Sequence, residues 1–95
     1  MKYFDWDPAK NEWLKVERGV CFDDIVSILE AQSFLEIFPH PNKEKYKNQK
    51  IYSVLFRNYV YLVPFVEDEE KIFLKTIIPS RKKTKQYLKL KDKKL

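Results

Sequence analysis

The sequence predicts one small α+β domain over residues 1–95, in the order β-α-α-β-β-β-β-α, with the two N-terminal helices on one face of an antiparallel sheet. Apolar residues make up 44% of the chain and aromatic residues 16%, which supplies large side chains for a core despite the short length. Apolar residues are spaced as in helices before residue 32, and they form strand-like runs between residues 50 and 78. This separation of helices from strands is typical of an α+β fold.

The first elements are a short strand over residues 3–6 and a helix that follows it. Asp7 and Pro8 match an N-cap and the first helical position, because proline lacks only a donor that has no partner there. We expect this helix to run from Pro8 to Arg18 and to end at Gly19, the residue type best suited to a left-handed C-cap.

Trp13 and Val16 lie at a three-residue spacing and are expected to form the apolar stripe of that helix. A second helix is predicted from Phe22 to about residues 31–32, with two acidic residues in its first turn. A strand over residues 34–38 is then expected to stop at the Pro39-His40-Pro41 segment, because proline cannot donate to a ladder.

Three further strands predict an antiparallel meander. The first two, residues 51–56 and 59–66, are separated by Arg57-Asn58, which is a weaker hairpin signal than Asn-Gly. Pro64 implies an edge position or a bulge in the second of these strands. The third strand is expected over residues 71–78.

A final helix is predicted over residues 82–90, with few apolar side chains to dock it: Tyr87, Leu88 and Leu90. Residues 91–95 are expected to fray.

Positive charge is concentrated at the C-terminal end of the sequence. Residues 81–95 hold eight basic residues and one acidic residue, a net charge of +7, whereas residues 1–80 hold 11 basic and 13 acidic residues, a net charge of −2. The formal charge of +5 therefore comes entirely from the last fifteen residues. A polyanion is the partner that such a segment favours.

Several classes of function are disfavoured by composition. The single glycine, Gly19, argues against a glycine-rich phosphate loop, and one histidine with one cysteine cannot build a closed metal site. We therefore expect neither a metal nor a cofactor. The lone Cys21, the lack of a secretory signal and the absence of a long apolar run lead us to expect a reduced, cytoplasmic protein that does not bind membranes.

Four short motifs, in this order, resemble the BrnT family of toxins from bacterial type II toxin-antitoxin modules. They are the opening Phe4-Asp5-Trp6-Asp7-Pro8-Ala9-Lys10, then Gly19-Val20-Cys21-Phe22-Asp23-Asp24, then Glu44-Lys45-Tyr46, and finally Ser80-Arg81-Lys82-Lys83-Thr84-Lys85. The resemblance covers about residues 4–87 and is specific in the order of the motifs. It implies a compact RelE-like fold and metal-independent endoribonuclease activity on RNA. It also implies a cognate ribbon-helix-helix antitoxin that binds the toxin and, in complex with it, the operator DNA of their shared operon.

Catalytic candidates follow from what metal-free RNA cleavage needs: a base for the 2′-hydroxyl proton and cations for the scissile phosphate. Arg81 is the candidate phosphate ligand, Glu44 the candidate base and Lys45 a second cation. The alternatives are a solvated arginine at a strand end and a solvated charged loop. Thr84 is expected to have a structural role in the helix.

Nucleic-acid contacts are expected from Lys82, Lys83, Lys85 and Arg18. Arg18 occupies the position where the family has a histidine, which motivates a second hypothesis: a relative that binds nucleic acid or antitoxin through its basic C-terminal segment without cleaving RNA. A third hypothesis is that the lysine-rich end only docks the antitoxin or solubilises the chain.

Other side chains with chemical potential have structural explanations. His40, between two prolines, is expected on an exposed loop, and Cys21 is expected to be a small core residue. Tyr52, Tyr59 and Tyr61 are candidates for stacking RNA bases, although in so small a protein such residues more often form the core or its rim.

Overall fold

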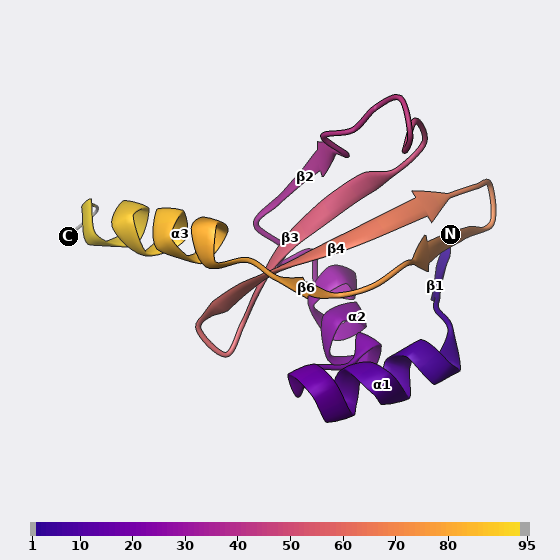
Figure 1. The fold of residues 1–95 in the computed structure, drawn as a ribbon, viewed down its shortest axis with the longest axis horizontal. Helices are drawn as coiled ribbons and strands as arrows, with labels where there is room; N and C mark the ends of the chain where they lie inside the picture. The colour runs from indigo at the N-terminus through magenta and orange to yellow at the C-terminus, as the bar shows by residue number, and fades with distance from the viewer. Residues whose placement is uncertain (1, 94–95) are drawn as a thin grey trace.

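The computed structural model describes the backbone of residues 2–93 and the side chains of residues 2–90. Within these residues, the strands and helices follow in the order shown in Figure 1: β1 (Tyr3–Asp5), α1 (Pro8–Arg18), α2 (Phe22–Glu30), β2 (Glu36–Pro39), β3 (Lys50–Phe56), β4 (Tyr59–Glu67), β5 (Lys71–Leu74), β6 (Ile78–Pro79) and α3 (Arg81–Lys93). The fold is α+β, as the sequence predicts. None of the described helices has both the length and the apolar character that a membrane span requires.

All six strands belong to one sheet, with the order β1-β5-β4-β3-β2 and with β6 paired to β4. The successive pairs β2–β3, β3–β4 and β4–β5 are antiparallel, which confirms the meander. Strand β1 pairs with β5 in parallel, so the sheet is mixed and the expectation of a purely antiparallel sheet is wrong. The direction of this pairing depends on how the chain returns across two helices and three strands, and local sequence does not encode it.

Helix α1 begins and ends where the sequence predicts. The Asp7 carboxylate accepts a hydrogen bond from the backbone N–H of Ala9 at 3.0 Å, and Gly19 has the left-handed φ of 65° that favours glycine at a C-cap. The expected apolar stripe is wrong, because Trp13 is 45% exposed and Val16 is 83% exposed. The buried positions are instead Asn11 and Leu14.

Asn11 is buried because it caps the next helix. The N-cap residue of α2, Cys21, makes no side-chain capping bond. The side-chain oxygen of Asn11 accepts the backbone N–H of Phe22 at 2.7 Å, while its amide nitrogen lies 3.4 Å from the Asp23 carboxylate. One polar side chain of α1 therefore satisfies the first free donor of α2.

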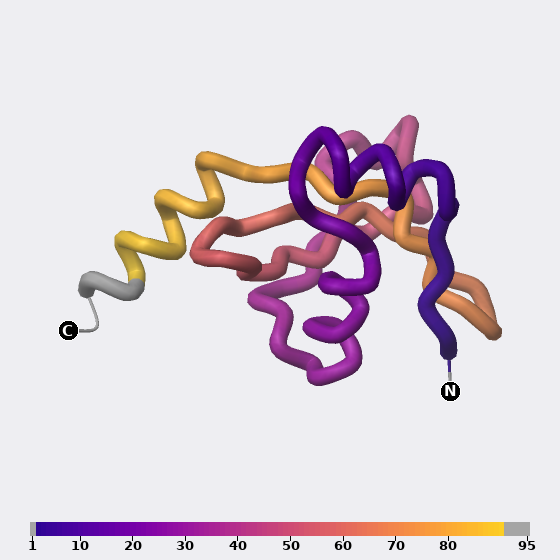
Figure 2. The backbone as a smooth tube through the Cα atoms, turned by 90° about the horizontal axis from the view of Figure 1, so that it is seen from below, coloured from indigo at the N-terminus to yellow at the C-terminus, as the bar shows by residue number. Residues whose placement is uncertain are grey.

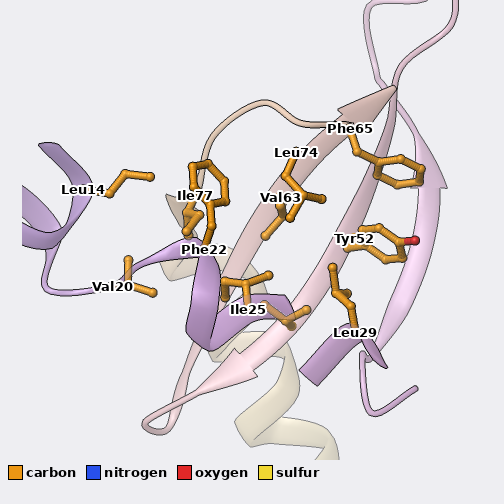
Figure 3. Packing of buried hydrophobic residues seen from close by; sticks show 11 residues of the cluster. Leu14, Val20, Phe22, Ile25, Leu29, Tyr52, Val63, Phe65, Leu74 and Ile77 are labelled. Atoms are coloured by element: carbon orange, nitrogen blue, oxygen red, sulfur yellow. The ribbon is translucent and has the colours of Figure 1, made fainter. Parts of the chain in front are cut away.

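The core lies between one face of the sheet and helices α1 and α2, and in Figure 3 their side chains point toward one another. Tyr52 pairs with Val63 across β3 and β4, so these two side chains share that face. The fully enclosed members come from both helices and the sheet: Leu14, Val20, Phe22, Ile25, Val54, Val63, Leu74 and Ile77. The apolar positions of α2 and of the meander thus form one contiguous cluster.

The β3–β4 turn confirms the predicted hairpin. Arg57 and Asn58 have φ values of 52° and 64°. Two successive residues with positive φ are the signature of the type I′ turn, whose twist matches that of the strands.

Pro64 does not lie on an edge strand, which corrects one of the two positions expected for it. It pairs with Ile51 within β4, a central strand. On the other side of β4, residues 61–62 pair with β6 and residues 65–67 pair with β5. Pro64 lies at the change of partner, where its missing N–H removes no bond from either ladder.

The predicted third strand is divided into β5 and β6 at this break. The connecting residue Lys75 donates its backbone N–H to the Pro64 carbonyl at 2.8 Å.

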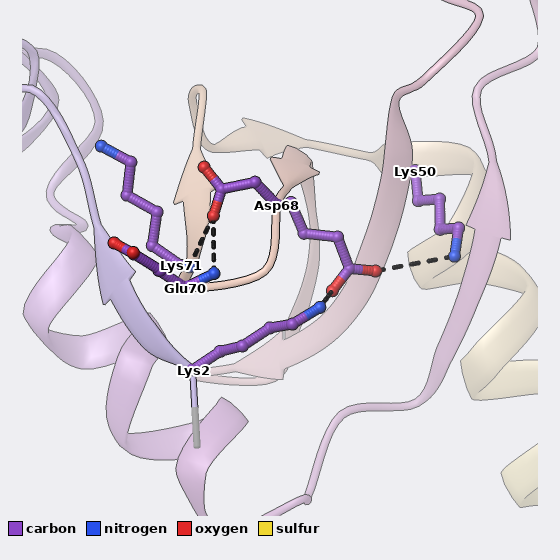
Figure 4. Close-up of polar contacts among 6 residues, drawn as sticks. Lys2, Lys50, Asp68, Glu70 and Lys71 are labelled. Carbon is purple, nitrogen blue, oxygen red and sulfur yellow. Dashed lines mark hydrogen bonds and ion pairs between the residues drawn. The ribbon is translucent and has the colours of Figure 1, made fainter.

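Charged side chains organise the β4–β5 turn and the start of β1 (Figure 4). Glu67 pairs with Lys2 at 2.8 Å and with Lys50 at 3.7 Å, and the hydrogen bond from Lys2 lowers the pKa of its carboxyl. Asp68 accepts the backbone N–H groups of Lys71 and Glu70, which lower its pKa as well. These contacts join three strand ends.

Candidate nucleic-acid interface

Helix α3 is attached to the sheet through its first turn. Ser80 caps it, because its hydroxyl accepts the backbone N–H of Lys83 at 3.1 Å. The buried Thr84 hydroxyl donates to the Ser80 carbonyl at 2.7 Å and accepts the backbone N–H of Val60 at 2.9 Å. Ser80 in turn donates its own N–H to the Val60 carbonyl. Thr84 therefore has the structural role that the sequence predicts, and it fixes the start of α3 against β4.

The rest of α3 extends away from the other elements, as Figures 1 and 2 both show. It is longer than the predicted helix, since it begins at Arg81 and continues to Lys93. Residues 94 and 95, where fraying is also expected, lie outside the described residues.

The candidate cations of α3 fall into two groups. Arg81, Lys82 and Lys85 are exposed. Lys83 is half-buried, with its ammonium 3.0 Å from the Glu36 carboxylate and 4.9 Å from the centroid of the Phe38 ring. Lys83 is thus engaged within the fold, while the other three present their charge to solvent on a helix whose first turn is anchored.

Arg18 lies beside the chain that leads to α3. Its guanidinium donates to the backbone carbonyl of Ile77, four residues before Arg81. It also lies 5.1 Å from the centroid of the Trp13 ring. The ammonium of Lys10 lies 4.8 Å from the same centroid. The side chain therefore joins α1 to the β5–β6 connection and contributes positive charge on that side of the molecule.

Glu44 and Lys45 are exposed in the loop between β2 and β3. The loop is held by Asn42, whose side-chain oxygen accepts the backbone N–H of Lys45 at 3.1 Å. It lies at the Lys50 end of β3, whereas α3 is anchored at the end where Leu55 pairs with Val60. Five residues of strand separate these two ends, about 17 Å at about 3.3 Å per residue. The structure does not bring this pair to Arg81.

The three candidate stacking tyrosines are not equivalent. Tyr52 is buried, stacked on Phe65 with ring centroids 4.2 Å apart, and burial raises the pKa of its hydroxyl. Tyr59 and Tyr61 are half-buried beside the hairpin turn, with centroids 5.7 Å apart. Arg57 lies over the neighbouring Phe56 ring. Only the hairpin pair therefore has ring surface on which a base can stack.

The remaining reactive side chains have local partners. The His40 ring packs on Tyr46 with centroids 4.2 Å apart, and its Nδ1 accepts the backbone N–H of Asn42. Cys21 is half-buried, its thiol donates to the Asp24 carboxylate at 3.1 Å, and burial raises its pKa. Among the described side chains, those of residues 2–90, no three His, Cys, Asp or Glu groups gather as a metal site would require.

Sequence reasoning missed a groove of about 480 Å³ between α3 and strands β2 and β3. Its α3 wall comes from a single helical stripe of four residues: Lys83, Gln86, Tyr87 and Leu90. The spacing of this stripe was visible in the sequence, but the strands that face it were not.

Comparisons with models of protein families, with curated proteins and with solved structures found no match to this chain.

Proposed function

We propose that this protein is a metal-independent endoribonuclease of the BrnT toxin type that binds RNA through α3. The observation that carries the proposal is the position of Arg81, exposed at the first turn of a helix that Ser80 and Thr84 hold against the sheet. A guanidinium on an anchored element suits a phosphate, because its planar donors form two parallel hydrogen bonds.

In this mechanism the RNA 2′-oxygen bonds to the phosphorus as the bond to the 5′-oxygen breaks, and solvent water takes the 2′-hydroxyl proton and protonates the leaving 5′-oxygen. Arg81 holds the scissile phosphate and stabilises the negative charge that develops on it. Lys82 and Lys85, on the same exposed turns, neutralise flanking phosphates. Tyr59 and Tyr61 offer half-buried rings beside the hairpin for stacking an unpaired base. Glu44 and Lys45, at the other end of β3, contact a more distant part of a long RNA.

The test is cleavage of messenger RNA by the chain purified without a partner, in the presence of a chelator. We expect Arg81→Ala to reduce the cleavage rate by about 100-fold or more, the usual cost of removing one donor to a developing charge. Lys15→Ala is the matched control, because it removes an exposed cation of α1, and it should leave the rate within about twofold. Equal rates for the wild type and Arg81→Ala contradict the role proposed for Arg81. Absence of cleavage by the wild type contradicts the proposal that the protein is a ribonuclease.

A second candidate function is RNA binding without cleavage. It is favoured by the separation of Glu44 from Arg81 by about 17 Å of strand, and by the engagement of Arg18 with the Ile77 carbonyl. The measurement is the affinity for a single-stranded RNA at several salt concentrations. Three phosphate contacts predict a slope of about −2 in log K against log salt, without strand scission.

The proposed partner is a ribbon-helix-helix antitoxin, and through it operator DNA. This part of the proposal rests on the order of the four motifs. Co-expression with the product of the neighbouring reading frame tests it: a stable complex that suppresses RNA cleavage supports the module, and two proteins that purify separately contradict it.

A further inference from the structure

The groove between α3 and the sheet combines apolar walls with polar groups. Leu35 forms one wall and is 41% exposed, while Leu90 forms part of the other and is 61% exposed. Tyr87 lies beside Leu90 on the same stripe of α3. The Lys83–Glu36 ion pair bridges the two walls at the anchored end of α3. Apolar walls with a few converging polar groups are typical of binding sites.

A buried hydroxyl in the groove has no partner. Ser53 of β3 is 1% exposed and lines the groove, and its Oγ makes no hydrogen bond within the described residues. It pairs with Glu36 and with Leu62, so it points to the face of the sheet opposite the core. A buried hydroxyl without a partner destabilises the fold, and a ligand that bonds to it removes this cost.

We propose that this groove is a docking site for a short, acidic, amphipathic helix of another protein, with a polar residue in the middle of its apolar stripe. Apolar side chains of the partner pack between Leu35 and Leu90, and the central polar group bonds to Ser53. This site shares Lys82 with the proposed RNA interface, but its apolar lining contains neither Arg81 nor Lys85, so docking does not depend on RNA binding.

Charge complementarity identifies the partner. Lys82 and Lys89 are exposed on the flank of α3 next to the Gln86 side of the groove, so acidic residues beside the apolar stripe of the partner would meet them. A second copy of this chain fits poorly, because the segment that would enter carries a net charge of +7 over residues 81–95. Helix α3 extends beyond the sheet (Figure 1) and carries the exposed Leu90, so an elongated partner fits this groove better than a free small molecule.

The experiment uses two synthetic 18-residue helical peptides, both rich in Glu, with an apolar Leu stripe at i, i+3/i+4 and i+7 spacing. One carries Gln at the central stripe position and the other carries Leu there. A third peptide has the composition of the first but a scrambled order. Affinities for the whole chain are measured by isothermal titration calorimetry.

We expect the Gln peptide to bind at least tenfold more tightly than the scrambled peptide. Leu90→Ser should weaken its binding about tenfold, whereas Leu88→Ser should change it less than twofold. Leu88 is also an exposed leucine of α3, at 45%, but it does not line the groove, so it is the matched control. Ser53→Ala should abolish the preference for the Gln peptide over the Leu peptide.

Three outcomes would overturn the proposal. Equal affinity for the scrambled peptide means that only charge attracts the probe. Equal effects of Leu88→Ser and Leu90→Ser mean that the groove is not the site. Concentration-dependent dimerisation in sedimentation equilibrium that Leu90→Ser abolishes means that the occupant is a second copy of the chain.

Discussion

The two faces of the sheet are occupied in opposite ways. On one face, α1 and α2 enclose side chains such as Leu14, Phe22 and Ile25 completely. On the other face, α3 is held by the hydrogen bonds of its first turn, centred on Thr84, and leaves Leu90 exposed beside an open groove. Stability is therefore concentrated on the core face, whereas the α3 face keeps charge and apolar surface available for partners.

The largest expected effect is on the core face. Phe22→Ala removes a fully enclosed ring that stacks on Trp6 with centroids 5.8 Å apart. We expect a loss of about 3–5 kcal/mol in the free energy of unfolding. Urea denaturation measures it, and a loss below about 1 kcal/mol would show that the core relaxes into the cavity.

The anchor of α3 is the next most sensitive point. Thr84→Val keeps the shape of the side chain but leaves the buried N–H of Val60 without its acceptor. The expected loss is about 1–3 kcal/mol. Hydrogen exchange should accelerate at Val60 and along α3, while the amides of α1 and α2 change little. Thr84→Ser keeps the hydroxyl and serves as the control.

A smaller effect is expected at the cap that Asn11 provides for α2. Asn11→Ala removes the acceptor of the Phe22 N–H and should cost about 1–2 kcal/mol. Cys21→Ser in the same background places a capping hydroxyl at the N-cap position and should recover part of the loss. Thermal melts of the three proteins test this, and no recovery would mean that Asn11 acts by packing alone.

Because Glu67 in the β4–β5 turn forms ion pairs, we expect a modest loss of stability in acid. The pKa of Glu67 is lower in the folded state than in the unfolded state, so its contribution is complete above its unfolded pKa and disappears as the pH falls through its folded pKa. Because this ion pair is partly exposed, the contribution should be below about 1 kcal/mol. Glu67→Gln should flatten the stability curve below about pH 5, and an unchanged curve would contradict the assignment.

The smallest effect on stability is expected on the exposed side of α3. Lys85→Ser should change the free energy of unfolding by less than about 0.5 kcal/mol. The same substitution should weaken RNA binding and lower the salt slope by about 0.7. Unchanged RNA binding would mean that Lys85 is not part of the proposed RNA interface.

Local signals in the sequence predict most of the elements. Asp7 and Gly19 predict both ends of α1, and the structure places them as N-cap and C-cap. The Arg57-Asn58 pair predicts the hairpin turn. These predictions succeed because caps and tight turns depend on a few neighbouring residues. The apolar stripe of α1 is predicted wrongly, since a buried Asn11 is explained only by its contact with α2.

The candidate site was predictable only in part. The exposed cations Arg81, Lys82 and Lys85 follow from the charge pattern of the C-terminal segment. The ion pair that Lys83 forms with Glu36 joins residues 47 positions apart. This ion pair forms only because the first turns of α3 lie beside β2, and no local sequence pattern indicates that placement.

By itself, the sequence determined the separation of a nearly neutral body from a strongly positive end, because charge is a property of composition. It also determined where α1 starts and stops. Three features emerge only in the folded domain: β1 runs parallel to β5, Glu44 lies far from Arg81, and Ser53 faces a groove. Each of these depends on contacts between residues distant in the chain, whose geometry is set by packing of the whole domain.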